Sequence, residues 1–141
     1  MYLLDVNVLV GAMRTDAPVH AVMGRCIEKL RNSPEPFGLC EPVLSGAIRV
    51  LTHPRVFTPP TPLPLAVSFV RALRDSLNAI VLQPGPRHWE LFLSFLSTSR
   101  AVGNMVPAAW IAALAMEHSC EMLSDDTDYA RFPGVRWRRP D

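Results

Sequence analysis

The amino-acid sequence predicts an α/β fold: a three-layer α/β/α sandwich around a central, mostly parallel sheet of four to five strands. Short apolar segments of three or four residues alternate with longer amphipathic segments along the whole chain. The short segments are apolar throughout, which is typical of strands buried on both faces of a parallel sheet. With 141 residues and 49% hydrophobic composition, the chain fits one domain with one core, residues 1–141.

Prolines, glycines and the periodicity of the apolar residues set the expected elements. The predicted strands are 2–4, 37–40, 79–82 and 121–123, with a fifth, edge strand at 135–137. The predicted helices are 6–13, 18–30, 41–51, one from about residue 64, 87–99, and one that starts at Pro107. Helix 87–99 is amphipathic, with apolar residues at Trp89, Phe92, Leu93 and Leu96. We expect Trp89, Phe92, Phe95 and Trp110 in the core or in a dimer interface, rather than as platforms for base stacking.

Composition and charge exclude several classes of protein. The net charge of +1 gives no strong overall positive field, so it does not by itself indicate a nucleic-acid-binding protein. No apolar run is long enough to cross a bilayer, and the N-terminus has no basic leader. We therefore expect a cytoplasmic protein without a membrane role. The three cysteines, Cys26, Cys40 and Cys120, are widely spaced and odd in number, which predicts free core thiols.

Three predicted strands run directly into acidic residues. Asp5 follows the first strand, Glu41 follows the second, and Asp126 comes just after strand 121–123. The carboxyl ends of parallel strands lie at one edge of the sheet, where ligands bind. Clustered carboxylates repel one another unless a cation or protons offset their charge, and hard oxygen ligands suit Mg²⁺ or Mn²⁺. The sequence therefore predicts an acidic metal pocket formed by Asp5, Glu41 and Asp126.

Each acid also has a purely structural interpretation. Asp5 could cap the helix that follows it, and Glu41 could complement a helix dipole. Asp126 and Asp128 could be turn formers, because aspartate stabilises turns through its own backbone. Asn7 could hold a carboxylate or a metal-bound water, or could form only an Asx turn. The coincidence of acids at three strand ends favours the metal pocket.

Several segments, taken in order, carry a resemblance to a known family. They are residues 1–10 (MYLLDVNVLV), Glu41 with 43–46 and 49–50, 52–57 (THPRVF), 84–90 (PGPRHWE), 103–107 (GNMVP), 112–118 (AALAMEH) and 126–134 (DTDYARFPG). Together they resemble the PIN domains, and in particular the VapC toxins of bacterial toxin–antitoxin pairs. The resemblance covers nearly the whole chain.

The resemblance implies a Mg²⁺-dependent endoribonuclease that cleaves RNA when it is freed from its antitoxin. Its metal-site acids fall on Asp5, Glu41 and Asp126, with Asp128 as an accessory residue beside Asn7. It also implies a VapB-type antitoxin that presents a basic side chain to the acidic pocket. A homodimer is implied as well, for which a helix over residues 65–77 could supply the surface.

One position departs from the family pattern. After Val106 and Pro107 such toxins carry an aspartate, whereas this chain has Ala108. The loss of one of four acids is expected to weaken Mg²⁺ binding and to impair catalysis. The intact match around Ala108 favours an engineered change that silences the enzyme, and a natural variant of lowered activity is the alternative. The alternative function is a catalytically weak PIN domain that acts mainly as an antitoxin-binding module.

Overall fold

The computed structural model describes residues 1–141 and contains five strands, six α-helices and one 3-10 helix. The strands are β1 (Tyr2–Leu4), β2 (Phe37–Leu39), β3 (Ala79–Val81), β4 (Glu121–Leu123) and β5 (Trp137–Arg138). The helices are α1 (Val6–Met13), α2 (His20–Asn32), α3 (Glu41–Leu51), α4 (Leu63–Arg74), α5 (His88–Ser99) and α6 (Met105–Glu117), with the 3-10 helix η1 (Thr127–Arg131) after β4.

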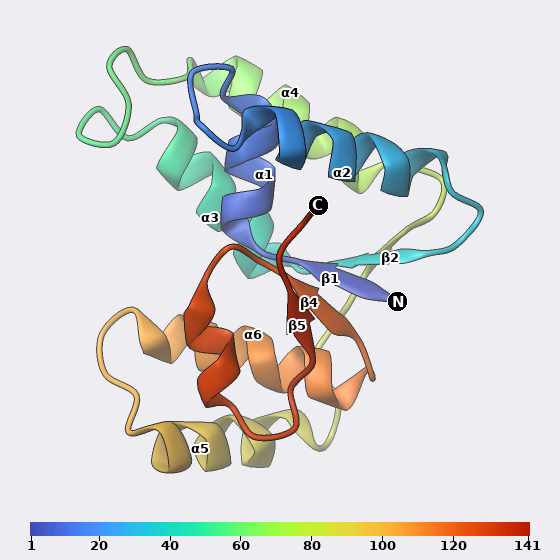
Figure 1. Ribbon diagram of the computed structural model, residues 1–141, viewed down its shortest axis with the longest axis vertical. Helices are drawn as coiled ribbons and strands as arrows, with labels where there is room; N and C mark the ends of the chain where they lie inside the picture. The colour runs from blue at the N-terminus through green and yellow to red at the C-terminus, as the bar shows by residue number, and fades with distance from the viewer.

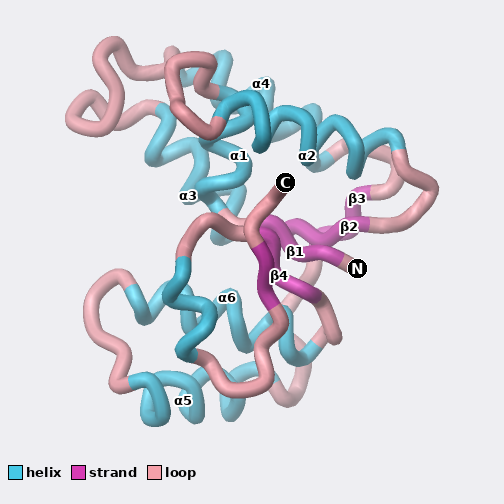
Figure 2. Tube along the Cα trace, viewed as in Figure 1, coloured by secondary structure: helices cyan, strands magenta, loops and turns pink.

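The five strands form one parallel sheet in the order β3-β2-β1-β4-β5. Helices α1 to α4 lie on one side of this sheet, and α5 and α6 lie on the other (Figures 1 and 2). The chain passes from β1 outward to β2 and β3, and later adds β4 on the other side of β1. The strand order therefore reverses at β1 and β4, which is where parallel sheets bind ligands. The predicted α/β/α sandwich is confirmed.

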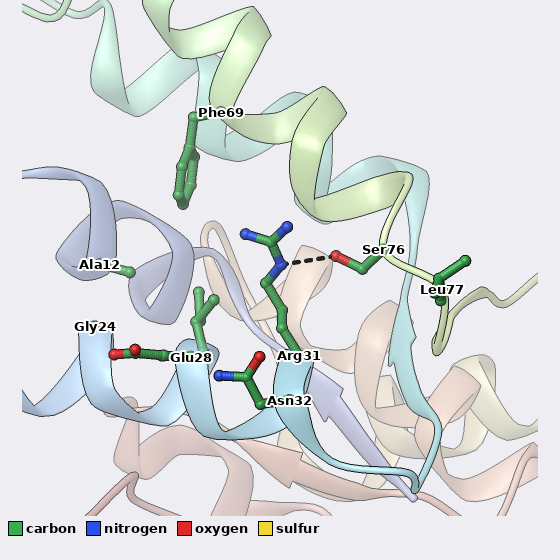
Figure 3. Close-up of a pocket in the computed structure, with 9 residues that line it drawn as sticks. Ala12, Gly24, Glu28, Arg31, Asn32, Phe69, Ser76 and Leu77 are labelled. Atoms are coloured by element: carbon green, nitrogen blue, oxygen red, sulfur yellow. Dashed lines mark hydrogen bonds between the residues drawn. The ribbon is translucent and has the colours of Figure 1, made fainter.

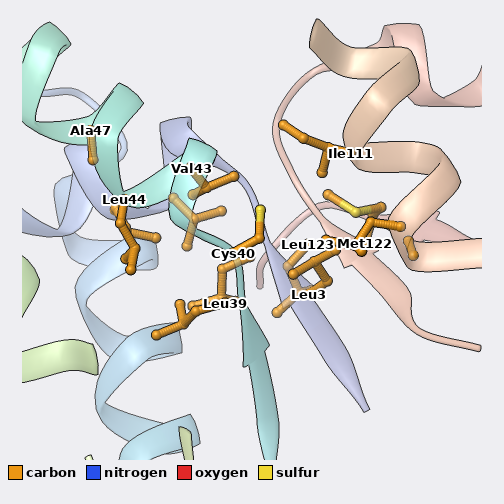
Figure 4. Close-up of a cluster of buried hydrophobic side chains, with 14 of the residues drawn as sticks. Leu3, Leu39, Cys40, Val43, Leu44, Ala47, Ile111, Met122 and Leu123 are labelled. Carbon is orange, nitrogen blue, oxygen red and sulfur yellow. The ribbon is translucent and has the colours of Figure 1, made fainter. Parts of the chain in front are cut away.

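The core lies on both faces of the three central strands. Leu3 in β1, Leu39 in β2 and Met122 in β4 have no solvent-exposed surface. Leu44 of α3 and Ile111 of α6 approach these strands from opposite sides (Figure 4). Apolar burial on both faces explains why the strand segments are apolar without alternation.

Helix α6 is apolar on nearly all sides because it packs against the sheet and against α5. Its buried residues are Ala108, Ala109, Ile111, Ala112, Ala113, Leu114 and Ala115. Such an all-round apolar pattern is typical of a helix enclosed by other elements. The many alanines keep this helix thin enough to fit between its neighbours.

The element boundaries agree with the predictions except at a few ends. Helix α6 starts at Met105, two residues before the predicted start at Pro107. A proline is tolerated in the first turn of a helix because the first backbone N–H groups have no intrahelical partner. Helix α2 starts at His20 rather than at Pro18, and the edge strand β5 is shifted to Trp137–Arg138.

Helix α5 exposes one residue that the sequence placed in a core or an interface. Trp89 is 59% exposed, whereas Phe92 and Phe95 are buried. Trp89 is therefore not part of the core of the single chain, and a dimer interface at this face stays a prediction. The three cysteines are buried free thiols, as predicted. None of the helices combines the length and apolar character required to span a membrane.

A core truncation tests this packing. Leu3→Ala removes a side chain with no exposed surface and should lower the free energy of unfolding by about 2–5 kcal/mol. Leu77→Ala is the matched control, because Leu77 is fully exposed and its truncation should change stability by less than about 0.5 kcal/mol. Urea unfolding of both variants measures the difference. Equal losses in the two variants would contradict the packing described above.

Candidate functional site

Asp5 lies at the point where the strand order reverses. It follows β1 directly, its backbone N–H donates to the Leu123 carbonyl of β4 at 3.1 Å, and its side chain caps α1. The cap is a 2.8 Å hydrogen bond from the Val6 N–H to Asp5 Oδ1. The capping interpretation of Asp5 is therefore correct, and it is compatible with a functional role because the carboxylate, 7% exposed, still faces this edge.

Ser124 connects the acids of the site. Its hydroxyl donates to Asp5 Oδ2 at 2.6 Å and accepts from Asn7 Nδ2 and from the Asp126 N–H, both at 3.0 Å. Asn7 Nδ2 also reaches Asp5 Oδ2 at 3.1 Å, and Asn7 Oδ1 accepts from the Asp125 N–H at 3.0 Å. Ser124 was not among the predicted site residues. Its signal in the sequence is a polar residue between an apolar strand and two aspartates.

Burial dominates the electrostatics of Asp5. It raises the pKa of the Asp5 carboxyl above the usual value of 3.8, and the nearby Asp126 carboxylate raises it further. Hydrogen bonds from Ser124, from the Val6 N–H and from Tyr129 act in the opposite direction. Burial and the two nearby carboxylates also raise the pKa of Tyr129 well above its usual value. The phenol therefore stays protonated at neutral pH.

Asp126 and Asp128 open the η1 turn. Asp126 Oδ1 accepts from the Asp128 N–H at 2.8 Å, so Asp126 is also a turn former. Asp126 Oδ2 has no hydrogen-bond or ion-pair partner in the protein, which leaves one oxygen available beside Asp5. Asp128 lies farther out, with its Oδ1 at 4.0 Å from Arg131 Nη1.

Glu41 stands apart from the two aspartates. It is the first residue of α3, and its side chain is 61% exposed. Its Oε1 accepts from Gln83 Nε2 at 3.4 Å, and its Oε2 lies 3.8 Å from Arg74 Nη2. No group of three or more His, Cys, Asp or Glu side chains is close enough to hold a metal ion. The structure thus joins Asp5, Asn7 and Asp126, and it leaves Glu41 at the rim of the same edge.

Ala108 belongs to the same end of the molecule. Helix α6 leads into β4, so it runs antiparallel to the strands and begins at their carboxyl edge. Ala108 is the fourth residue of this helix and is 7% exposed. An acid at this position would be largely buried, and it would increase the negative charge at the edge that carries Asp5 and Asp126.

The donor chemistry of this edge fits a hard divalent cation. Mg²⁺ in proteins is held by one or two carboxylates and keeps waters or substrate phosphates as its other ligands. Asp5 and the available oxygen of Asp126 supply such a pair. The larger predicted set, Asp5, Glu41 and Asp126 with Asp128 as accessory, stays a prediction.

The raised pKa of Asp5 gives a stability test. A carboxyl with a raised pKa contributes stability that is fully present below pH 3.8 and is lost as the pH rises through its folded-state pKa. Asp5→Asn cannot titrate, so lowering the pH from 7 towards 4 should stabilise the wild type relative to this variant. Urea unfolding of both proteins along the pH series measures the difference. A constant difference, or one that favours the variant at low pH, would contradict the burial of this charge.

Comparisons with known proteins show which family this sequence matches. The sequence matches the family described as PIN domain over residues 2–135. Ribonuclease VapC43 of Mycobacterium tuberculosis is 45% identical over 99% of this chain and 95% of its own length. Ribonuclease VapC25 of the same species is 36% identical over 99% of both chains.

Solved structures support the fold. A crystal structure of Mycobacterium tuberculosis VapC20, described as a sarcin-ricin loop cleaving toxin, has a TM-score of 0.75 at 15% identity and covers 99% of this chain and 100% of that one. VapBC2 of Rickettsia felis bound to a promoter DNA fragment has a TM-score of 0.71 at 14% identity, with 99% and 98% covered. Full-length sequence identity and the matching fold show that this chain belongs to the PIN-domain family and, within it, to the VapC ribonucleases.

Proposed function

We propose that the protein is a Mg²⁺-dependent endoribonuclease toxin of a type II toxin–antitoxin pair, with Mn²⁺ as a possible substitute metal. It cleaves RNA, a cognate VapB-type antitoxin inhibits it, and Ala108 impairs its catalysis. The observation that carries this proposal is the hydrogen-bonded set of Asp5, Asn7, Ser124 and Asp126 at the strand-order reversal. The relatives at 36–45% identity over the whole chain are named ribonucleases.

The residues of the network have distinct roles in this proposal. Asp5 and Asp126 would hold the metal ion, which supplies charge for the developing transition state and a water of lowered pKa for attack on the phosphodiester. Ser124 and Asn7 fix the orientation of the Asp5 carboxylate through the 2.6 Å and 3.1 Å hydrogen bonds to Oδ2. Tyr129, 1% exposed, excludes water from the inner side of Asp5.

Glu41 would act from the rim. Its exposure and its long contacts to Gln83 and Arg74 leave it free to change rotamer when RNA and metal bind. There it would accept a proton from the attacking water as a general base. Asp128, which only reaches Arg131 at 4.0 Å, would contribute charge at the outer side as an accessory residue.

Restoring an acid at position 108 tests the enzyme proposal. Ala108→Asp should raise Mg²⁺-dependent RNA cleavage by at least roughly 10- to 100-fold, because losing even an outer-shell partner of a metal ligand typically lowers metal affinity or activity by that order. The buried new carboxylate should also destabilise the metal-free protein, and Mg²⁺ or Mn²⁺ should recover the lost stability. Cleavage of a panel of structured RNAs that includes a sarcin–ricin loop, together with thermal unfolding with and without metal, measures both effects.

Two variants serve as controls for this experiment. Ala108→Asn has nearly the same shape as the aspartate but no charge, so it should restore neither cleavage nor the metal-dependent stability. Asp5→Asn combined with Ala108→Asp should lose cleavage again. If Ala108→Asp folds but cleaves none of the RNAs with either metal, the nuclease proposal fails and the antitoxin-binding module takes its place.

The second element of the proposal is the VapB-type partner. A hollow of about 590 Å³ lies between α1, α2 and α4, away from the site acids Asp5, Glu41 and Asp126. It is lined by Ala12, Gly24, Ile27, Glu28, Arg31, Asn32, Phe69, Ser76 and Leu77 (Figure 3). Small residues, Ala12 and Gly24, allow a close approach, and a Cβ on Gly24 would meet nothing within 4 Å. Phe69 and the fully exposed Leu77 supply apolar surface. We assign this hollow to an antitoxin helix, because amphipathic helices bind in grooves of this kind.

Filling the hollow tests this assignment. Gly24→Trp should lower the affinity for the antitoxin encoded beside this gene at least tenfold, whereas Gly24→Ala should leave it unchanged, because its Cβ enters open space. Both variants should fold normally. Titration of the purified partners by calorimetry measures the affinities. Equal affinity of both variants would place the antitoxin elsewhere.

A further inference from the structure

We propose that Arg74, Arg131 and Arg139 bind phosphates of the RNA on both sides of the acidic centre. The three arginines come from separate elements: the end of α4, η1, and the segment after β5. This inference rests on the proposed nuclease function and assigns part of its substrate-binding surface. We call these residues the arginine rim.

Arg139 is tied to the network around Asp5. Its Nε lies 3.1 Å from Asp125 Oδ1, and the Asp125 N–H donates to Asn7 Oδ1 at 3.0 Å. Arg139 directly follows β5, which is parallel to β4, so it lies at the same carboxyl edge as Asp126. The contact to Asp125 uses only Nε, and the side chain is 60% exposed. Both Nη groups of Arg139 therefore remain available to a ligand.

Arg131 and Arg74 have the same character. Arg131 reaches Asp128 Oδ1 at 4.0 Å and Met105 Sδ at 3.2 Å, both through Nη1, and it is 57% exposed. Arg74 is 48% exposed, and its one ion pair is the 3.8 Å approach of Nη2 to Glu41 Oε2. Each guanidinium is thus held next to a candidate site acid by a single nitrogen.

Arg14, a half-buried arginine elsewhere in the structure, uses each of its side-chain nitrogens as a donor within the protein. Arg14, 13% exposed, donates through Nε and Nη2 to Asp16 and through Nη1 to the Pro59 carbonyl and the Thr61 hydroxyl. All of its nitrogens are occupied within the protein. The rim arginines keep most of theirs free, and exposed ion pairs of this length add little to stability. Their placement is therefore better explained by a ligand that accepts hydrogen bonds from the free N–H groups of these arginines.

The positions along the sheet edge match a nucleic-acid backbone. Arg74 lies at the β2 side with Glu41, whereas Arg131 and Arg139 lie at the β4 and β5 side. Asp5 and Asp126 lie between them, because β1 and β4 are the inner strands of this part of the sheet. Three strand spacings separate β2 from β5, about 14 Å, which is wider than one phosphate group. Guanidinium groups bind phosphate through paired N–H donors, so the rim can hold phosphates that flank the scissile one.

RNA binding measured without cleavage tests the rim. The probes are a fluorescein-labelled single-stranded RNA and a labelled sarcin–ricin hairpin, titrated with antitoxin-free protein in EDTA at several NaCl concentrations. Each of Arg74→Gln, Arg131→Gln and Arg139→Gln should weaken binding of the single strand about fivefold at 0.1 M salt. One phosphate contact contributes about 0.7 to the slope of log affinity against log salt, which is about fivefold in affinity over the tenfold range below 1 M salt. The triple variant should lower the slope by about 2.

Matched variants separate phosphate binding from other effects. Arg25→Gln removes an exposed arginine of α2, and it should leave affinity and slope unchanged. Arg139→Lys keeps the charge, so it should keep the salt slope. The rim is overturned if the wild type binds neither RNA, or if the folded triple variant binds with the affinity and slope of the wild type. A wild type that binds RNA through the rim while Ala108→Asp cleaves nothing would refute only the nuclease proposal.

Discussion

The short hydrogen bond between the Ser124 hydroxyl and Asp5 Oδ2, 2.6 Å, joins the ends of β1 and β4, and the functional edge of the molecule depends on it. The same hydroxyl accepts from Asn7 Nδ2 and from the Asp126 N–H, so one buried atom orients the whole network. A polar group without exposed surface is tolerated only when its hydrogen bonds are satisfied. Ser124 meets this condition because all of its partners belong to the site.

Two kinds of acid result from this arrangement. Asp5 is buried, has little freedom and carries a pKa raised by burial and by Asp126. Glu41 is exposed and meets only Gln83 and Arg74 at the long end of contact distances. Clustered charge in a low-dielectric environment is typical of functional sites, because ligand binding or catalysis offsets an electrostatic repulsion that destabilises the folded protein by itself. In the proposed function, the inner pair would hold the metal ion in one place, and the exposed outer acid would adjust to the substrate.

The net charge of +1 conceals an ordered local distribution. Three acids of this edge, Glu41, Asp125 and Asp128, each have one exposed arginine beside them. Each of these acids is paired with an arginine, so no long-range field develops, yet groups suited to a cation and to a phosphate lie close together. Ala108 follows a different constraint. The helix that carries it packs between the sheet and α5, where small apolar residues fit. An aspartate at this position would bury a charge, so only a role in the functional site would explain it.

The sequence by itself determined the fold class, most element boundaries, and the placement of Asp5 and Asp126 at strand ends, because apolar periodicity, prolines and strand-to-acid junctions are local signals. Tertiary structure alone decided that Ser124, 119 residues from Asp5, joins the two aspartates, that Glu41 stays at the rim, and that Trp89 faces solvent. A pattern along the chain shows which residues are apolar or charged. Which of them meet is decided by how distant elements pack, and no local signal contains that information.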